Sequence, residues 1–270
     1  VAAGITRYPL QDLWGSNGVM LYVKAGQEYG TIYGYDYTYL NGKKVVKRVL
    51  DKNDNSKVVG TQYVTTSEPV AIGNATPKLT GGLGNTFRYK NFSLYFLTDF
   101  KIGGQIYSAD YAAAMGEGLS PRTLKERNGG GLPYTYPDGT TANTGVILDG
   151  VFADGTPNTD VVNYLYKYAG QYGAWSNVPM PRSNAIFTNS WAKLRELTLT
   201  YSLPEKLIKR TKVLQGLDIS LVGRNLFYFF TTLPDHLNPE AINGIGNGQG
   251  IQWSEFPGTR DLGFSIKVQL

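Results

Sequence analysis

The chain has 270 residues, of which 41% are hydrophobic and 17% are charged, so wholesale disorder is excluded. It contains 33 Gly, 20 Tyr and no Cys, a composition that favours strands and turns and excludes disulfides and thiolate chemistry. The net charge is only +5, and no run approaches the roughly 18 apolar residues of a membrane-spanning helix. An all-β fold is therefore expected, and helical membrane proteins are excluded.

Residues 1–78 are polar and rich in tyrosine and turn residues, which predicts a folded loop region. The start, VAAGITRYPLQDLWG, has neither the basic residues nor the continuous apolar stretch of a signal peptide. The sequence is therefore interpreted as a mature or excised piece.

One loop in this region, DKNDNSK, has the oxygen-rich character of a calcium loop, because Asp51, Asn53 and Asn55 stand at alternate positions. It lacks the glycine expected at the sixth position and the glutamate expected at the twelfth, where Ser56 and Gln62 stand. An ordinary turn is preferred, with loop calcium as the weaker alternative and no other cofactor or metal expected.

Residues 79–90 and 91–102 are predicted to form two strands joined by a tight turn at YKN. In the second, Phe92, Leu94 and Phe96 share one face, whereas Ser93 and Tyr95 lie on the other. Successive side chains of a strand point to opposite faces, so one face is apolar and the other near water.

Residues 103–190 show no sustained period and are expected to form a long loop, an uncommon feature inside a compact soluble domain. The loop is rich in aromatic residues, which pack on one another or stack on sugars and peptides. Packing is the preferred interpretation, and Tyr172 and Trp175 are the candidate substrate contacts.

Two more strands are predicted at 191–202 and 217–230. The connection between them is short and carries the one dense basic cluster, which no base-stacking aromatic residue interrupts, so no nucleic-acid partner is expected. The cluster comprises Lys206, Lys209, Arg210 and Lys212.

Residues 231–258 form a further predicted loop, which contains the only histidine, His236. Nothing beside it resembles a nucleophile elbow, and sequence spacing does not reveal whether Asp149 and Asp154 approach each other as glycosidase carboxylates would. The chain is therefore not expected to be an enzyme.

The final segment, 259–270, alternates without interruption to its last residue. Its even positions from Leu262 are apolar, and its odd positions from Asp261 are polar or glycine. The connections between the five strands alternate between short and long, which is typical of the turns and loops of an outer-membrane barrel. Lipid on one face and a polar pore on the other are therefore expected.

Several separated blocks resemble one known family. GNTFRYKNFSLYFLTDFKIGGQIYS, NSWAKLRELTLTYSLPEKLIKR, LDISLVGRNLFYFF and PGTRDLGFSIKVQL resemble, in this order, the C-terminal portion of the SusC/RagA-like TonB-dependent transporters of Bacteroidetes outer membranes. The resemblance implies a transmembrane β-barrel of about 22 strands when intact, of which 79–270 supplies the last five, with extracellular loops at 1–78, 103–190 and 231–258.

The resemblance also implies a role and partners. The intact protein would import oligosaccharides or peptides across the outer membrane of a Gram-negative bacterium, with a SusD-like surface lipoprotein as a lid and with TonB engaged through the missing N-terminal part. The last strand would carry the barrel-assembly signal, at the positions Asp261, Gly263, Ile266, Val268 and Leu270. The family usually closes on an aromatic residue, from which Leu270 departs.

Two alternative functions belong to other classes of protein, a binding module and an enzyme. A soluble β-rich glycan-binding module of a secreted protein would pack the apolar strand faces on each other. A secreted hydrolase would depend on His236 or a loop carboxylate.

Overall fold

The computed structural model describes residues 8–12, 18–172, 180–211, 213–241, 249–254 and 256–270. It separates into two compact units, each assembled from distant parts of the sequence. The first unit comprises residues 1–76, 105–187 and 242–255, and the second comprises residues 77–104, 188–241 and 256–270. Among the described residues, none of the helices is long and apolar enough to cross a membrane.

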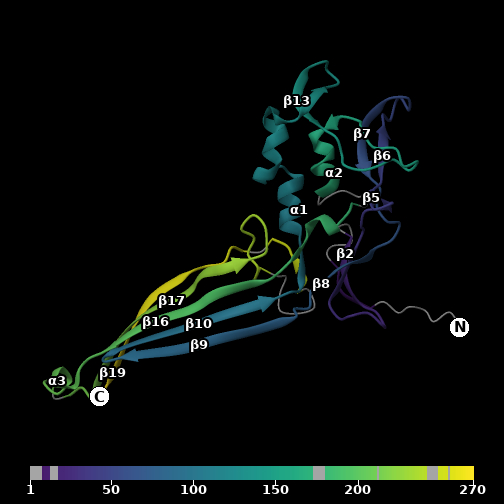
Figure 1. Ribbon diagram of the computed structural model, residues 1–270. Helices are drawn as coiled ribbons and strands as arrows, with labels where there is room; N and C mark the ends of the chain where they lie inside the picture. The colour runs from purple at the N-terminus through teal and green to yellow at the C-terminus, as the bar shows by residue number, and fades with distance from the viewer. Residues whose placement is uncertain (1–7, 13–17, 173–179, 212, 242–248, 255) are drawn as a thin grey trace. The chain divides into compact units, whose positions relative to one another are not determined.

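The second unit is built on one five-stranded sheet in the order β19-β17-β16-β10-β9, with every neighbouring pair antiparallel. These strands lie at the segments where the sequence alternates (Figure 1). Their bounds are Leu79–Tyr89 (β9), Phe92–Ile102 (β10), Trp191–Ser202 (β16), Gly216–Thr231 (β17) and Asp261–Gln269 (β19).

The two short connections and the last strand's end lie at the same end of this sheet. β9 and β10 are joined through Lys90 and Asn91, and Lys90 adopts the left-handed conformation that a tight turn needs. β16 and β17 are joined through residues 203–215, which contain the single helical turn α3 (Glu205–Ile208). Phe92 pairs with Tyr201, and Gly216 pairs with Gln269, so both turns and the end of β19 lie at the same end of the sheet (Figure 1).

The first unit, which includes the predicted folded loop region and most of the predicted long loop at 103–190, contains several small sheets. The largest joins β1 (Tyr8–Asp12), β2 (Val19–Val23), β3 (Thr31–Gly34) and β8 (Val70–Asn74). Two hairpins pair β4 (Tyr39–Leu40) with β5 (Lys43–Lys44), and β6 (Val46–Leu50) with β7 (Val58–Tyr63). Three-stranded sheets combine β11 (Gln105–Ser108), β15 (Ile186–Thr188) and β18 (Ile251–Gln252), and β12 (Leu132–Thr135), β13 (Thr141–Val146) and β14 (Val162–Asn163).

Helices in this unit are short. The longest, α1 (Ala109–Gly116), begins where the Ser108 hydroxyl accepts the backbone N–H of Tyr111, and alanines favour its continuation. The same hydroxyl donates to Gln252 at 2.7 Å, which attaches the start of the helix to β18. The others are α2 (Ala169–Tyr172), the turns Pro121–Thr123, Tyr164–Tyr166 and Ser183–Ala185, and a π-type turn at Glu126–Gly130.

A small apolar core joins these parts of the first unit. Val46 of β6 packs with Val146, Leu148 and Val162, and tyrosine rings cover the cluster. The packing is close enough to require glycine at Gly60, because an added Cβ would lie 2.0 Å from the ring of Tyr166. Residues distant in sequence therefore form a folded unit rather than a loose loop.

Candidate functional site

The five-stranded sheet has one continuous apolar face. Residues directly opposite each other in antiparallel strands share a face, and the register places apolar side chains in register on all five strands. Two such rows are Phe87, Leu94, Leu199, Leu221 and Phe264, and Tyr89, Phe92, Tyr201, Ile219 and Ile266.

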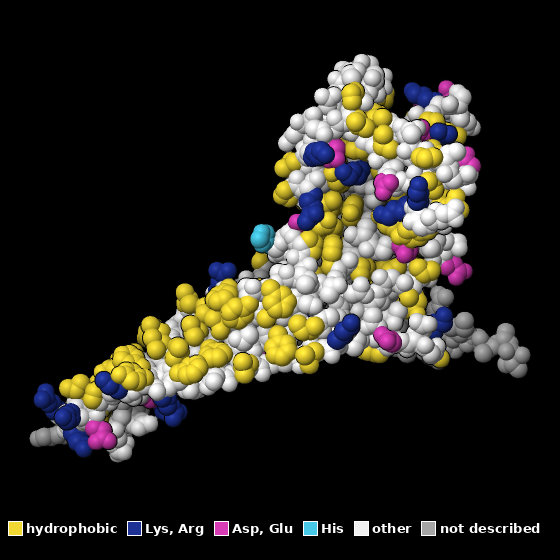
Figure 2. Space-filling model, viewed as in Figure 1, with side chains coloured by type: hydrophobic (Ala, Val, Ile, Leu, Met, Phe, Trp, Pro, Cys, Tyr) yellow, Lys and Arg dark blue, Asp and Glu magenta, His cyan; other side chains and the backbone are white. Residues whose placement is uncertain are grey.

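These side chains are exposed, apart from the half-buried Tyr201, rather than packed against a second layer. Phe264 is 75% exposed and Leu221 is 61% exposed, and Figure 2 shows hydrophobic side chains gathered over the sheet. Monomeric soluble proteins rarely leave a continuous apolar surface of this kind in water. The face therefore fits an apolar medium.

The opposite face is polar. Its rows across the five strands include Arg88, Ser93, Thr200, Ser220 and Ser265, and Gly84, Leu97, Glu196, Arg224 and Asp261. The hydroxyls of Thr200 and Ser220 lie 2.8 Å apart, and Arg224 donates to Glu196 at 3.3 Å.

A β-bulge at Arg195 interrupts the alternation. Leu97 pairs with Glu196 and Thr98 pairs with Leu194, so Arg195 is an extra residue on β16. On the neighbouring β17, Asn225 adopts a left-handed conformation and accepts a hydrogen bond of 2.7 Å from Arg195. The bulge lets Arg195 reach the polar face, where it donates to Asp99 at 2.6 Å.

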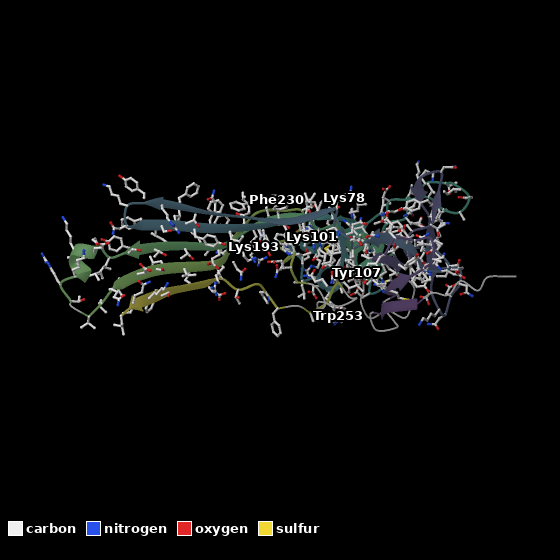
Figure 3. The ribbon with its side chains drawn as sticks, turned by 90° about the horizontal axis from the view of Figure 1, so that it is seen from below. Lys78, Lys101, Tyr107, Lys193, Phe230 and Trp253 are labelled. Atoms are coloured by element: carbon white, nitrogen blue, oxygen red, sulfur yellow. The ribbon has the colours of Figure 1, made fainter. Side chains whose placement is uncertain are left out.

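A carboxylate from the following connection completes this cluster. Glu240 accepts from Lys193 at 2.6 Å and from the hydroxyl of Tyr228 at 2.8 Å, and it also pairs with Arg195. Lys193, labelled in Figure 3, is only 6% exposed. The four charges of Asp99, Glu240, Lys193 and Arg195 sum to zero, so each buried charge has a partner.

The surroundings of Glu240 change its acidity. Burial by itself would raise the pKa of the Glu240 carboxyl, but hydrogen bonds from Arg195, Lys193 and Tyr228 outweigh burial and lower the pKa to about 2. Glu240 is therefore ionised at any neutral or mildly acidic pH.

The first unit contains a cavity of about 330 Å³ with several tyrosines in its wall. Tyr172, predicted from the sequence as a substrate contact, is one of its lining residues, with Tyr63 and Tyr168. The hydroxyl of Tyr63 donates to the backbone oxygen of Asp149 at 3.0 Å, and that of Tyr168 donates to Glu126 at 2.7 Å. Both hydroxyls are thus engaged, and these hydrogen bonds hold the two rings in place.

Both charged residues in the cavity wall have neighbours of opposite sign. Lys167 donates to Glu126 at 2.7 Å, and Asp149 attracts the amine of Lys44. Burial, followed by the nearby hydroxyl of Tyr111, raises the pKa of Tyr172 to about 12, so its hydroxyl stays neutral. The cavity therefore offers aromatic surface and the Gln171 amide without a strong excess of charge.

The other predicted residues are dispersed. Trp175 and Lys212 lie outside the described residues. His236 is exposed and has a left-handed backbone conformation. Asp154 accepts two hydrogen bonds from Thr156 in a local turn, one from the backbone N–H at 2.9 Å and one from the hydroxyl at 2.6 Å.

The candidate calcium loop joins β6 and β7. The Asp51 carboxylate accepts the backbone N–H of Asn53 at 2.9 Å, and Asp54 accepts from Ser56 in the same way. Within the described part of the chain, no three His, Cys, Asp or Glu side chains gather as a metal site. Calcium binding by Asp51, Asn53 and Asn55 stays the weaker alternative to an ordinary turn and is untested.

The predicted assembly signal lies on β19, at the edge of the sheet. Asp261 and Gly263 fall on the polar face, opposite Arg224 and Val222. Ile266 and Val268 fall on the apolar face, and Leu270 follows the strand and is 75% exposed. Among the described strands, β19 pairs with β17 alone, so its outer edge is open for pairing.

Comparison with known proteins gives a match over most of the chain. No family model matches it. It is 23% identical over 262 residues to "TonB-dependent receptor P3" of Formosa agariphila, an alignment that covers 92% of this chain and 23% of that protein. The predicted resemblance to TonB-dependent receptors is confirmed.

Solved structures show the same fold. The RagAB peptide importer in its "closed-closed" and "open-open" states matches 99% and 100% of this chain, each with a TM-score of 0.52 and 20% identity. The chain covers 25% of the matched chain in each structure. It therefore spans about a quarter of the length of these TonB-dependent and RagAB proteins. They are receptors and importers, in agreement with the prediction that the chain is not an enzyme.

Proposed function

We propose that this chain forms the C-terminal section of the barrel of a TonB-dependent nutrient importer in the outer membrane of a Gram-negative bacterium. The observation that carries the proposal is the continuous apolar face across five strands, opposite a face that holds ion pairs. Lipid would cover the first face, and the second would line a polar pore.

The connections support an orientation. The turns at 90–91 and 203–215 would lie in the periplasm, because outer-membrane barrels have short periplasmic turns. The long connections at 103–190 and 231–258, with residues 1–78, would lie outside the cell, where the first unit would provide a folded extracellular region.

The edges of the sheet support a larger barrel. Among the strands that the structure describes, β9 and β19 each have one neighbour, and an unpaired strand edge in lipid costs several kcal/mol per backbone group. The proposal is that both edges pair with strands from the remainder of a protein as long as the relatives, to give about 22 strands.

The substrate and partners follow from the same proposal. One structural neighbour is a peptide importer, so a peptide is one candidate, and an oligosaccharide is the other. The cavity beside Tyr172 would contact the substrate, a SusD-like lipoprotein would cover the barrel, and TonB would supply energy through another part of the protein.

Site-directed spin labelling tests the membrane orientation. The 270 residues contain no cysteine, so only cysteines elsewhere in the full-length protein need replacement before single cysteines are introduced. Labels at Leu94, Leu199 and Leu221 should collide with dissolved oxygen, which concentrates in lipid. Labels at the neighbouring Ser93, Thr200 and Ser220 should collide with a water-soluble nickel complex.

The opposite result would support the alternative of a soluble glycan-binding module. In that case the protein would dissolve without detergent, and the label at Leu221 would be shielded from both reagents by a second protein layer. Either observation would overturn the importer proposal.

A further inference from the structure

The connection that leaves β17 does not run directly away from the sheet. Residues 232–241, named here the inner segment, turn back over the polar face, where Glu240 contacts Tyr228. Tyr228 lies three residues before the end of β17 at Thr231, so the inner segment reaches back by roughly 10 Å at about 3.3 Å per residue.

The inner segment is attached at several points. Thr232 donates through its backbone N–H to Ser190 at 3.0 Å, and Asn189 donates to the backbone oxygen of Pro239 at 2.9 Å. The side-chain oxygen of Asn238 lies 2.9 Å from the Tyr228 hydroxyl and accepts the backbone N–H of Glu240 at 3.2 Å. Leu233 and Ala241 are buried, so both ends of the segment are packed.

Glu240 adds a charged attachment of the inner segment, and its partners lie on two strands of the sheet. Lys193 and Arg195 come from β16, and Tyr228 comes from β17. Arg195 reaches Glu240 because the bulge turns its side chain to the polar face. Without Glu240, Lys193 would be a buried cation without its carboxylate, an arrangement that costs several kcal/mol.

We propose that the inner segment is a pore-lining constriction, and that Glu240 fastens it to the barrel wall. The inference rests on the proposed function, since the polar face lines a pore only if the apolar face meets lipid. If this proposal holds, the connection 231–258 begins inside the pore and is not a wholly extracellular loop. The constriction limits the size of solutes that pass beside the wall formed by β16 and β17.

The attachment is tested by distance measurements in the full-length protein in outer membranes. Spin labels at His236, exposed in the inner segment, and at Leu207, exposed at the opposite end of the sheet, should give a narrow distance distribution. The Glu240→Ala variant should lose the narrow peak. The matched control Glu196→Ala removes the Arg224 pair on the same face and should retain the peak.

The constriction is tested by the entry of vancomycin, which is too large for ordinary porins. Cells with Glu240→Ala should become more sensitive to it than cells with Glu196→Ala at equal levels of assembled protein. If Glu240→Ala does not assemble, Glu240→Gln keeps the size of the side chain and removes the charge that pairs with Lys193 and Arg195, and it should broaden the same distribution.

Each outcome decides the proposal. An unchanged peak in the assembled Glu240→Ala variant, or in Glu240→Gln if that variant is needed, overturns the fastening role. A broadened peak with unchanged vancomycin sensitivity overturns the constriction. Failure of the proposed function is seen separately, because the labels at Leu221 and Ser220 would then not divide between lipid and water.

Discussion

The Arg195 guanidinium lies 2.6 Å from the carboxylate of Asp99, although strict alternation along β16 would place Arg195 on the apolar face with Leu197. Because of the bulge, the Arg195 side chain lies on the polar face, where Asp99 and Glu240 are its partners. The polar face therefore holds a neutral group of four charges at the level where the inner segment returns.

Replacing Arg195 tests this group of charges. Arg195→Leu leaves Asp99 and Glu240 without their shared cation, and we expect a loss of roughly 1–3 kcal/mol in the free energy of unfolding. Urea unfolding of the full-length protein in lipid vesicles measures it. The control Arg224→Leu removes a more exposed ion pair and should cost less than about 1 kcal/mol. Equal losses would contradict the role of the bulge.

Charge placement on β17 tests the two faces directly. Leu221→Arg puts a cation on the proposed lipid face and should destabilise the barrel by about 2–4 kcal/mol. Ser220→Arg puts the same charge on the next residue, which faces the polar side, and should cost much less. The amount of heat-modifiable folded protein in the outer membrane is the measurement. A larger loss of folded protein in Ser220→Arg than in Leu221→Arg would indicate that the face with Ser220, and not the face with Leu221, meets lipid.

The pH dependence of the inner segment follows from Glu240. Its pKa is lowered from the ordinary 4.5 to about 2 by Arg195, Lys193 and Tyr228, with Asp99 as the other charge of the group. A lowered pKa gives stabilisation that is complete above the ordinary value and is lost as the pH falls through about 2. The distance between labels at His236 and Leu207 should therefore be unchanged from pH 7 to pH 5. Broadening within that range would show that Glu240 is not held as an ion.

The cavity in the first unit gives a prediction for uptake. Tyr172→Ala removes one aromatic side chain from the cavity wall and should lower uptake of the cognate peptide or oligosaccharide by roughly fivefold, since one aromatic contact is worth about 1 kcal/mol. Trp175→Ala tests the second predicted contact in the same assay. Tyr29→Ala, at an exposed tyrosine outside the cavity wall, is the control. Unchanged uptake in both test variants would assign these aromatics to packing.

The end of the chain gives a prediction for assembly. The family resemblance implies that an aromatic last residue strengthens the assembly signal, and Leu270 is exposed beyond β19. Leu270→Phe should therefore speed the appearance of folded protein in a pulse-chase experiment, whereas Ile266→Asp should slow it. No change in either variant would separate these positions from assembly.

The sequence by itself determined the long strands and their faces. A period of two needs only local geometry, so alternation at residues 92–96 and 262–270 placed apolar side chains on one face, as the register then shows. It also indicated the transporter resemblance. It did not reveal α1, whose eight residues are too few for a visible helical period, although Ser108 before an alanine-rich stretch is a start signal.

Only the tertiary structure decided the charge group and the cavity. Arg195 changes face through an extra residue whose presence depends on partners in two neighbouring strands, and Glu240 arrives from a connection with no period of its own. Tyr63 and Tyr172 are more than a hundred positions apart and meet at one cavity because the first unit folds them together. Local periodicity fixes which way a strand residue points, whereas contacts between distant residues depend on how the segments pack.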